Sequence, residues 1–362
     1  MIYKLRPSIA VVELENRIEF FLTNIRKSIS LEGLTEVKEF LFKFDGKKEL
    51  EEILENENLD ERSRDEAKYL IEYLNEKNIL LKIDENYKAT YKEYPRVYNL
   101  LEDYFNSVSK VNKAFERVKT SRVMIIGLGA VGTWVAHNLV MSGVENLILV
   151  DFDKVELSNL HRQVGFFSED IGRYKIDALS DRLLEFNENL KISKIKDKLD
   201  SEFFKRIDFT KIDLIINCAD YPSVDKTSII VGEYCMKNNI NHLIGGGYNL
   251  HLSLIGQVVI PGKTACVKCF EKSLEELNKI DTKNIKKLEN KDRKVGSFPP
   301  LTSLSASITS NEAFKCLAGI NELVMNENRS EFLIKDMNFR NIKMTRRKDC
   351  DWCGEEGEFY RI

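Results

Sequence analysis

A cluster of charged and amide side chains follows one apolar stretch of the sequence. The segment VDFDKVELSNLHRQ, residues 150–163, contains Asp151, Asp153, Asn159, Arg162 and Gln163. A glycine-rich turn, GLGAVG at 127–132, lies about twenty residues before it. A dinucleotide-binding domain places one carboxylate at this distance to hold a ribose. Two carboxylates and a guanidinium together indicate a ligand that carries phosphate as well as hydroxyl groups.

The glycine-rich turn has the spacing of a phosphate-binding loop. Gly127, Gly129 and Gly132 form GxGxxG between an apolar strand and a predicted helix. Such a turn directs backbone N–H groups at phosphate. By itself it is compatible with NAD, FAD, S-adenosylmethionine or ATP, or with glycines that only allow tight packing of strand and helix.

The residues after the glycine-rich turn favour one of these ligands, ATP, with a polyphosphate that is cleaved. Asp151 is placed for the ribose, and Lys175 comes thirteen residues after Arg162, at the start of a predicted helix. Arginine and lysine together favour a polyphosphate, since a guanidinium binds phosphate oxygens in a bidentate way. Asp220, in NCAD at the carboxyl end of a predicted strand, is a candidate magnesium ligand. We also assign Asp153, Asn159 and Gln163 to the nucleotide site.

Cysteine spacing predicts a metal site. Four of the seven cysteines form two CxxC pairs, CVKC at 266–269 and CDWC at 350–353. In a reducing compartment such pairs indicate metal rather than disulfides, and a closed four-cysteine zinc site is structural. The alternative is two chance pairs of reduced cysteines. The expected zinc ligands are Cys266, Cys269, Cys350 and Cys353.

In combination, the motifs resemble a known family. GLGAVG, DFDKVELSNLHRQ, IGRYKIDAL, NCAD and GQVVIPGKTACVKC match, in order and spacing, the adenylating domain of ubiquitin-activating-type (E1-like) enzymes. Bacterial relatives include the ThiF, MoeB and MccB proteins, and the resemblance covers residues 95–355. It implies that Asp151 contacts the ribose of ATP and that Arg162 and Lys175 stabilise the α-phosphate. It further implies that Asp220 coordinates Mg²⁺ and that the four paired cysteines hold structural Zn²⁺.

The resemblance also implies a homodimer. In relatives, an arginine from the partner subunit completes the ATP site. Arg96, in YPRVYN upstream of the first apolar strand, stands at roughly the corresponding place.

From residue 121 the sequence alternates apolar strands with helices. RVMIIGLG, NLILVDFD, IDLIINCAD and NHLIGGGY are the expected strands, with helical segments between them. This order predicts a doubly wound, Rossmann-like α/β domain over 121–362, with a zinc-bound C-terminal portion.

Residues 1–84 are expected to form a separate small α+β, winged-helix-like domain. Strands are predicted on both sides of a turn at Glu15–Asn16, then a helix over 34–44, an Asp-Gly turn running into a helix over 45–54, a helix from Asp60 and a strand at 79–83. This order resembles precursor-peptide recognition domains, which bind a leader peptide as an added strand. The alternative is a generic appendage of the main domain. Residues 85–120 read as a linker up to Pro95, followed by a helix.

Composition excludes some classes of protein. The net charge is −3 although 31% of residues are charged, which argues against a dedicated nucleic-acid binder. No apolar run has the length of a membrane span, and no signal segment is evident. We therefore expect a cytoplasmic protein without membrane or nucleic-acid partners.

The remaining cysteines and the histidines suggest no covalent catalysis. The charged segment 270–300, directly after the first cysteine pair, contains no cysteine; it is expected to be solvated and to order over a bound peptide. Cys218, Cys235 and Cys316 fall in a buried strand or in helices, where core packing is the expected role. No enzyme-bound thioester is therefore expected. His137, His161, His242 and His251 have no partners at catalytic or metal spacing.

Three functions remain open from the sequence. The leading one is an MccB-like enzyme that uses ATP to adenylate a carboxylate or amide of a ribosomally made precursor peptide. A second is activation of a sulfur-carrier protein, as ThiF and MoeB do. A third is a non-catalytic partner that presents leader peptides to another enzyme; the intact Asp151, Arg162, Lys175 and Asp220 argue against it. The peptide, the nucleotide base and the fate of the adenylate are not determined by the sequence.

Overall fold

A computed structural model describes residues 1–32, 35–57, 59–207, 211–245, 248–249, 252–277, 296–325 and 327–360. The chain divides into two compact units, Met1–Arg117 and Val118–Ile362. Within the described residues, no helix is both long and apolar enough to cross a membrane.

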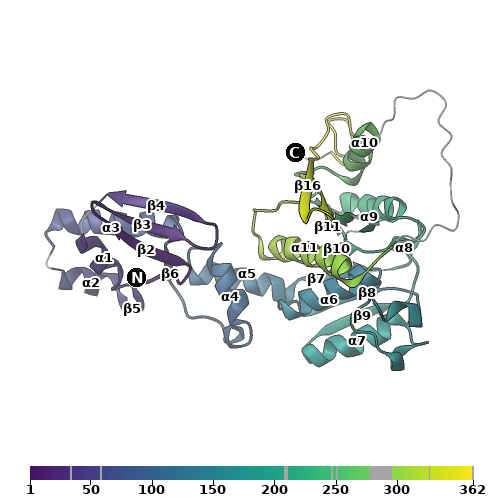
Figure 1. Cartoon of the computed structure of the whole chain (residues 1–362), viewed down its shortest axis with the longest axis horizontal. Coiled ribbons are helices and arrows are strands. Elements are labelled where there is room, and N and C mark those ends of the chain that lie inside the picture. Colours follow the sequence, from purple (N-terminus) through teal and green to yellow (C-terminus); the bar gives the residue numbers. More distant parts are fainter. Residues whose placement is uncertain are drawn as a thin grey trace. The chain divides into compact units, whose positions relative to one another are not determined.

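The first unit combines two small antiparallel sheets with helices (Figure 1). One sheet has the order β2–β3–β4, and the other has the order β5–β1–β6. The strands are β1 (Ile2–Leu5), β2 (Ile9–Leu14), β3 (Arg17–Leu22), β4 (Lys27–Glu32), β5 (Asp45–Glu49) and β6 (Leu80–Ile83). The helices are α1 (Thr35–Leu41), α2 (Leu50–Asn56), α3 (Glu61–Glu76), α4 (Pro95–Glu102) and α5 (Val108–Thr120), with a 3₁₀ turn at Ala89–Lys92. The boundary between the units falls within the last turn of α5.

Alternation along β3 explains the core of this unit. Ile18, Phe20 and Leu22 are buried on one face, against residues such as Leu41 and Ile71 from the helices. The long helix α3 begins where the sequence predicts, because Asp60 accepts a hydrogen bond from the Ser63 N–H at 2.7 Å. The mixed α+β class expected for this unit is therefore confirmed.

One local prediction in the first unit is wrong. Residues 45–49 were expected to turn and enter a helix, but they form β5, and only 50–56 are helical. The reason is a partner distant in sequence: β5 pairs with β1, joining Ile2 to Glu49 and Lys4 to Asp45. The strand β1 itself was not predicted.

Residues 85–117 belong to the first compact unit. The Asp84 carboxylate accepts hydrogen bonds from Ser109 N and Oγ at 2.9 and 2.6 Å. Arg6 donates to the carbonyl of Phe105 at 2.8 Å, and Asn75 donates to that of Asn106 at 2.7 Å. These contacts fix the polar, aromatic segment onto α3 and onto the residues that directly follow β1 and β6. The functional division at residue 84 stays a prediction.

The second unit is built on a six-stranded sheet with the order β14–β11–β10–β7–β8–β9. All neighbours are parallel except β11 and β14. The strands are β7 (Arg122–Ile126), β8 (Asn146–Val150), β9 (Lys191–Ile195), β10 (Leu214–Asn217), β11 (Asn241–Ile244) and β14 (Val258–Val259). The strands β7, β8 and β10 are buried almost throughout, as expected for parallel strands covered on both faces.

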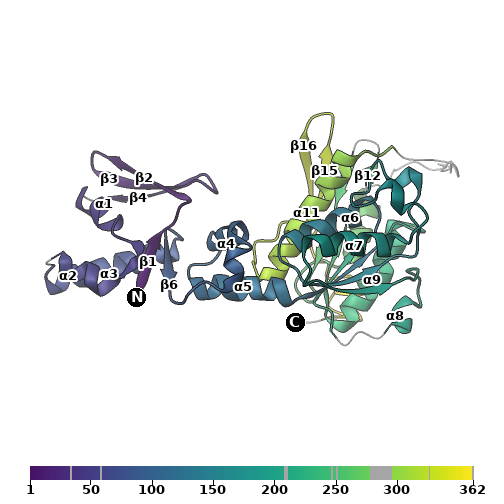
Figure 2. The same ribbon diagram turned by 90° about the horizontal axis from the view of Figure 1, so that it is seen from below.

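Helices cover both faces of this sheet (Figure 2). They include α6 (Ala130–Met141), α7 (Lys175–Phe186), α8 (Phe203–Arg206) and α9 (Val224–Asn238). Figure 2 shows α6 and α7 on one side and α8 and α9 on the other. The chain runs from β7 outward to β9 and then returns to β10, on the other side of β7. The carboxyl ends of β7 and β10 therefore form the switch point at which such sheets bind ligands. The predicted doubly wound fold is confirmed.

The C-terminal portion adds a second sheet and two helices. The sheet has the order β12–β13–β15–β16, with β12 (Tyr248–Asn249), β13 (Leu252–Ile255), β15 (Asn328–Leu333) and β16 (Asn338–Lys343). The helix α11 (Pro299–Ala318) packs against α6 and β13. The helix α10 (Val267–Leu277) begins at the first cysteine pair. His251 and most of the predicted charged loop lie outside the described residues.

Candidate active site

The three glycines of the turn have different roles. Gly127 ends β7 with φ +89°, and a Cβ there would lie 2.7 Å from the Ala219 backbone nitrogen. A Cβ on Gly132 would overlap the Gly127 carbonyl oxygen. Gly127 thus allows the loops after β7 and β10 to touch, and Gly132 allows α6 to pack against the residue that follows β7. Gly129, the N-cap of α6, has no atom within 4 Å of the corresponding position. Only Gly129 therefore leaves open space of the kind a phosphate group needs.

Asp151 ties the loop after β8 to the glycine turn. Its carboxylate accepts hydrogen bonds from Leu128 N at 2.6 Å and from Asp153 N at 2.7 Å. Burial raises the pKa of Asp151, while the Lys175 ammonium and these two N–H groups oppose that rise. Each oxygen retains a lone pair. The side chain can therefore accept a ribose hydroxyl while it holds the loop.

Lys175 is positioned by Asp153. Its ammonium lies 2.8 Å from the Asp153 carboxylate, and its backbone N–H donates to the Asp153 carbonyl at 2.9 Å. The Lys175 side chain is 8% exposed, whereas that of Asp153 is 49% exposed. Asp153, which the sequence analysis assigned to nucleotide binding, thus holds Lys175 in place. No sequence motif indicated this ion pair.

Arg162, Asn159 and Gln163 share one short turn. Leu157–Asn159 is a 3₁₀ turn (η2), and the Asn159 side chain accepts a hydrogen bond from Glu156 N at 3.0 Å. Arg162 donates to the Ser158 carbonyl, and its Nη1 lies 3.1 Å from His161 Nε2. Gln163 is buried, and its Oε1 has no hydrogen-bond partner among the described residues. Asn159 therefore shapes the turn, and Gln163 retains an unused acceptor.

Asp220 stands on a loop held by two polar residues. Asn217 Oδ1 accepts from Ala219 N at 3.2 Å, and Asn217 Nδ2 donates to Thr227 Oγ1 at 3.1 Å. The Thr227 hydroxyl also donates to the Ala219 carbonyl at 2.8 Å. Asp220 itself is exposed at the carboxyl end of β10. The sequence motif NCAD contained Asn217, but its role in fixing this loop emerges only with Thr227 beside it.

The structure brings together most of the predicted site residues of the second unit. Gly127, Asp151 and Asp220 follow β7, β8 and β10, which are neighbours or next neighbours in the sheet. Lys175 joins them through Asp153. Arg96 is exposed on the first turn of α4, in the first unit. Its role in the site stays a prediction.

The three unpaired cysteines are poor nucleophiles. Burial raises the pKa of Cys218 to about 12 and that of Cys316 to about 11. Burial also raises the pKa of Cys235 well above its ordinary value. Since the thiolate is the nucleophile, burial disfavours covalent chemistry at these three groups. The absence of an enzyme-bound thioester stays a prediction.

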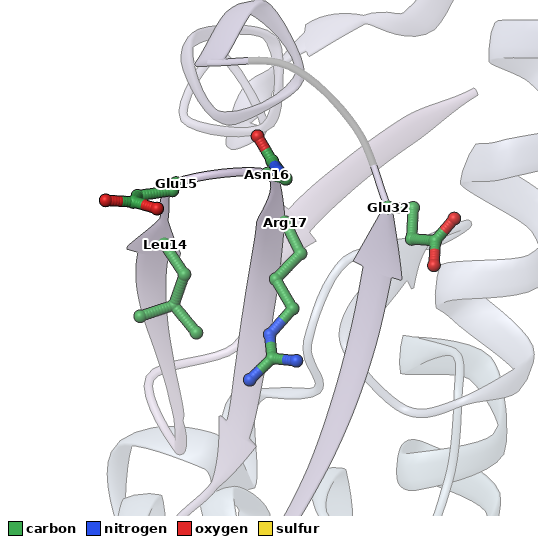
Figure 3. A pocket seen from close by; sticks show the side chains of 5 residues that line it. All are labelled: Leu14, Glu15, Asn16, Arg17 and Glu32. Carbon is green, nitrogen blue, oxygen red and sulfur yellow. The ribbon is translucent and has the colours of Figure 1, made fainter.

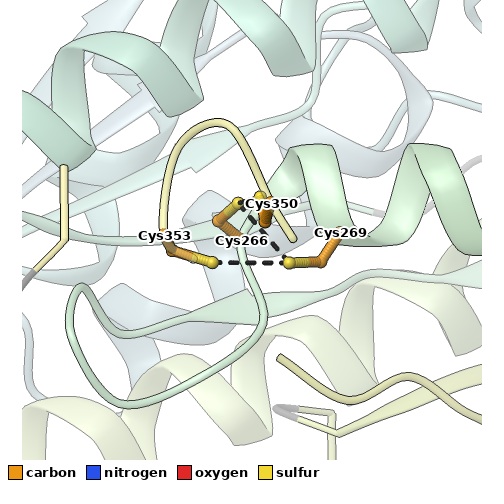
Figure 4. Close-up of side chains that lie close together, drawn as sticks. All are labelled: Cys266, Cys269, Cys350 and Cys353. Carbon is orange, nitrogen blue, oxygen red and sulfur yellow. Dashed lines mark hydrogen bonds between the residues drawn. The ribbon is translucent and has the colours of Figure 1, made fainter. Parts of the chain in front are cut away.

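The two CxxC pairs meet in one buried cluster (Figure 4). The four sulfur atoms lie within 4.8 Å of one another, with Cys266–Cys350 at 3.5 Å and Cys269–Cys353 at 3.3 Å. These distances exceed the roughly 2.05 Å of a disulfide. A tetrahedral zinc with Zn–S bonds of about 2.3 Å places its sulfur atoms about 3.8 Å apart. The donors therefore fit Zn²⁺.

The surroundings of the cluster also suit a metal. The Arg347 backbone N–H donates to Cys269 Sγ at 3.4 Å. Arg346 donates to the carbonyls of Cys353 and Gly262 at 2.9 and 2.6 Å. These hydrogen bonds orient the two CxxC segments, as the hydrogen-bonding groups around the ligands of a metal site do.

The sheet, glycine turn and carboxylates define a nucleotide-binding enzyme domain that carries a tetracysteine cluster. A model of the ThiF family matches residues 105–353. The chain belongs to the ThiF family.

Curated relatives agree with this assignment. The chain is 28% identical to the sulfur carrier protein ThiS adenylyltransferase of Escherichia coli K12, over 66% of this chain and 88% of that protein. It is 27% identical to the molybdopterin-synthase adenylyltransferase of the same strain, over 66% of this chain and 90% of that protein. The chain is thus an adenylyltransferase of the E1-like superfamily, a class that uses ATP.

Solved structures match the whole chain. Escherichia coli MccB superposes with a TM-score of 0.80 at 21% identity, covering 100% of this chain and 99% of that one. The structure of MccB with AMPCPP and MccA superposes with a TM-score of 0.76, covering 98% of this chain and 100% of that one. The likeness therefore includes both compact units and establishes an MccB-like fold.

Proposed function

We propose that this enzyme adenylates a ribosomally made peptide. The observation that carries the proposal is the extent of the structural match: MccB superposes over both units, whereas the two adenylyltransferase relatives align with 66% of the chain. MccB has been solved with AMPCPP and MccA together. The first unit is the part that a carrier-protein activator would not need.

The proposed chemistry uses the residues at the switch point. A carboxylate or amide oxygen of the peptide forms a bond to the α-phosphorus, the bond from that phosphorus to the β-phosphate bridging oxygen breaks, and pyrophosphate leaves with the electron pair. Lys175 and Arg162 stabilise the charge on the α-phosphate as preorganised cations. Asp151 holds the ribose. Asp220 would hold Mg²⁺, which would neutralise the leaving phosphates.

The first unit offers a place for the peptide. In the sheet β2–β3–β4, both outer strands have a free edge among the described residues. Beside the β2–β3 turn, a hollow of about 660 Å³ is lined by Leu14, Glu15, Asn16, Arg17 and Glu32 (Figure 3). Leu14, Arg17 and Glu32 form one cross-strand row, because Arg17 pairs with both of the others. An added peptide strand would place alternate side chains toward such a row.

The proposal is tested by the phosphate product. The substrate is sought among short peptides encoded next to this chain, and the enzyme is supplied with Mg·ATP and each candidate. We expect peptide-dependent release of pyrophosphate and an AMP-linked or AMP-derived peptide product. Release of orthophosphate would instead place cleavage at the γ-phosphate and contradict adenylation.

The second candidate function is activation of a sulfur-carrier protein. The similarity to the sulfur carrier protein ThiS adenylyltransferase favours it. The same assay separates the two functions: ThiS-like carriers ending in Gly-Gly would then elicit pyrophosphate release, and short peptides would not.

We also propose a homodimer in which Arg96 serves the partner's ATP site. A chain with Arg96→Ala and a chain with Lys175→Ala are each expected to lose most of their activity. Mixed dimers are expected to regain part of the activity, because one site in each mixed dimer has both residues intact. The measurement is pyrophosphate release after mixing, with dimer formation checked by light scattering. Absence of rescue in verified mixed dimers would contradict the shared site.

A further inference from the structure

The segment that carries Lys175 is held by two backbone pairings. Val155 N donates to the Arg173 carbonyl at 2.8 Å, and Gly172 N donates to the Val155 carbonyl at 2.9 Å. Lys154 and Tyr174 form an isolated antiparallel bridge between these pairings and Lys175. The backbone thus aligns residues 153–155 with residues 172–175, but it does not fix the direction of the side chains.

Two lysine side chains contact the ring of Tyr174 at this bridge, and together the three side chains form a stack. The Lys196 ammonium lies 4.6 Å from the centre of the Tyr174 ring, and the Lys154 ammonium lies 5.3 Å from it. Both distances are within the range of cation–π attraction. Tyr174 is the N-cap residue of α7, so the stacked ring immediately precedes Lys175.

An acidic residue on α7 anchors the stack. Asp177 accepts from Lys196 at 2.6 Å and from Lys194 at 2.9 Å. These ammonium groups lower the pKa of Asp177, with Lys196 the largest cause, so the carboxylate stays charged. Lys196 therefore binds the Tyr174 ring and Asp177 together, and it joins the end of β9 to the first turn of α7.

We infer that Tyr174 is a positioning residue for Lys175: its ring, contacted by the ammonium groups of Lys154 and Lys196, fixes the start of α7 so that Lys175 stays beside Asp153 and faces the nucleotide phosphates. Tyr174 touches no reacting atom and acts through Lys175. Its ring is the functional part, since no hydrogen bond of its hydroxyl is needed for the stack. The inference rests on the proposed role of Lys175.

The first test follows Lys175 directly and needs no peptide. The full-length protein is labelled with an amine-acetylating reagent, and the labelling rate of Lys175 is measured by mass spectrometry. In the parent, Lys175 is buried against Asp153, and slow labelling is expected. Tyr174→Leu is expected to accelerate it on the order of tenfold, because the first turn loses its stack. Tyr174→Phe keeps the ring and should leave the rate within about twofold of the parent.

A matched control removes a similar contact between a cation and a ring at a later turn of α7. The Arg182 guanidinium lies 4.6 Å from the Phe167 ring, which is 51% exposed. Phe167→Leu should leave Lys175 labelling unchanged. If Tyr174→Leu left the labelling rate at the parent value, or if Phe167→Leu raised it equally, the inference would be overturned.

The second test is a double-mutant cycle on turnover. Tyr174→Leu is expected to lower kcat for pyrophosphate release on the order of tenfold with little change in KM for ATP, as a misplaced catalytic group does. In a Lys175→Ala background the same change should cost less than about twofold, because residues that act as a unit are not additive. Equal losses in both backgrounds would overturn the inference. Full turnover by Lys175→Ala alone would instead contradict the proposed role of Lys175.

Discussion

At the scale of single residues, the charged groups of the nucleotide site have different partners and so different expected effects. Asp151→Ala should mainly raise KM for ATP, since the ribose contact is similar in the ground and transition states. Lys175→Ala and Arg162→Ala should each lower kcat on the order of 10²–10³, as loss of one preorganised donor does. The measurement is pyrophosphate release against ATP concentration. A kcat loss in Asp151→Ala with unchanged KM would contradict this division of roles.

A second residue-scale prediction concerns the buried His242. Burial lowers the pKa of His242 to about 4, below its ordinary value of about 6.5, and its Nε2 has no partner among the described residues. Because the folded pKa is depressed, the unfolded chain binds the proton first. This contribution to stability is complete above about pH 6.5 and is lost as the pH falls toward 4. Between pH 7.5 and pH 5 the loss amounts to about 2 kcal/mol.

The measurement compares urea unfolding at those two pH values. In His242→Gln, the difference in the free energy of unfolding between pH 7.5 and pH 5 should shrink by about 2 kcal/mol. An unchanged pH dependence in His242→Gln would show that this imidazole does not resist protonation.

At the scale of elements, the cysteine cluster connects the start of α10 to the C-terminal segment. Cys266 and Cys269 lie at α10, while Cys350 and Cys353 lie after β16, and Trp352 and Phe359 pack around them. A bound ion would therefore close a long loop of the chain between the two cysteine pairs. In theory, a cross-link stabilises the fold more when the loop that it closes is longer. About one zinc per chain is expected, since the site offers four sulfur ligands.

Cys350→Ser is expected to lower the zinc content and the melting temperature, because it removes one of four ligands and leaves a buried hydroxyl. The measurements are metal analysis and calorimetry. Cys235→Ser, at a buried cysteine of α9 outside the cluster, is the control for thiol loss and should keep the zinc. A protein that is fully stable and metal-free with all four cysteines intact would refute a structural zinc site.

At the scale of the whole molecule, the two compact units suggest a division of labour. The predicted nucleotide residues Gly127, Asp151, Lys175 and Asp220 all lie in Val118–Ile362, whereas the proposed peptide-binding sheet lies in Met1–Arg117. Removal of residues 1–84 alone would strip Ser109 and Phe105 of their partners in the first unit. A cut at the unit boundary is therefore the cleaner experiment.

The second unit, produced from residue 118, is expected to bind Mg·ATP and to lose modification of the full precursor. Because the removed unit also carries Arg96, full-length Arg96→Ala is the control that separates loss of this arginine from loss of the peptide-binding sheet. ATP binding is measured by calorimetry, and modification is measured by mass spectrometry of the peptide. Melting curves confirm that the shortened protein is folded. Equal modification with and without the first unit would show that peptide recognition lies elsewhere.

The sequence by itself determined the features that depend on local pattern. The apolar runs of β7, β8 and β10 predicted a doubly wound sheet, because strands buried on both faces need continuous apolar side chains. The spacing within CxxC predicted the cysteine cluster, since two thiolates at that spacing reach one ion. Asp60 marked the start of α3 because an N-cap bond is made within three residues.

The tertiary structure alone decided which side chains meet. It pairs Lys175 with Asp153, directs Asn159 back to its own turn, and leaves open space above Gly129 but not above Gly127 or Gly132. It also pairs β5 with β1 and packs residues 85–117 onto the first unit. Each of these outcomes depends on a contact between segments distant in sequence or on the free space around an atom. Such contacts are set by the packing of the whole fold, and the local order of residue types does not contain them.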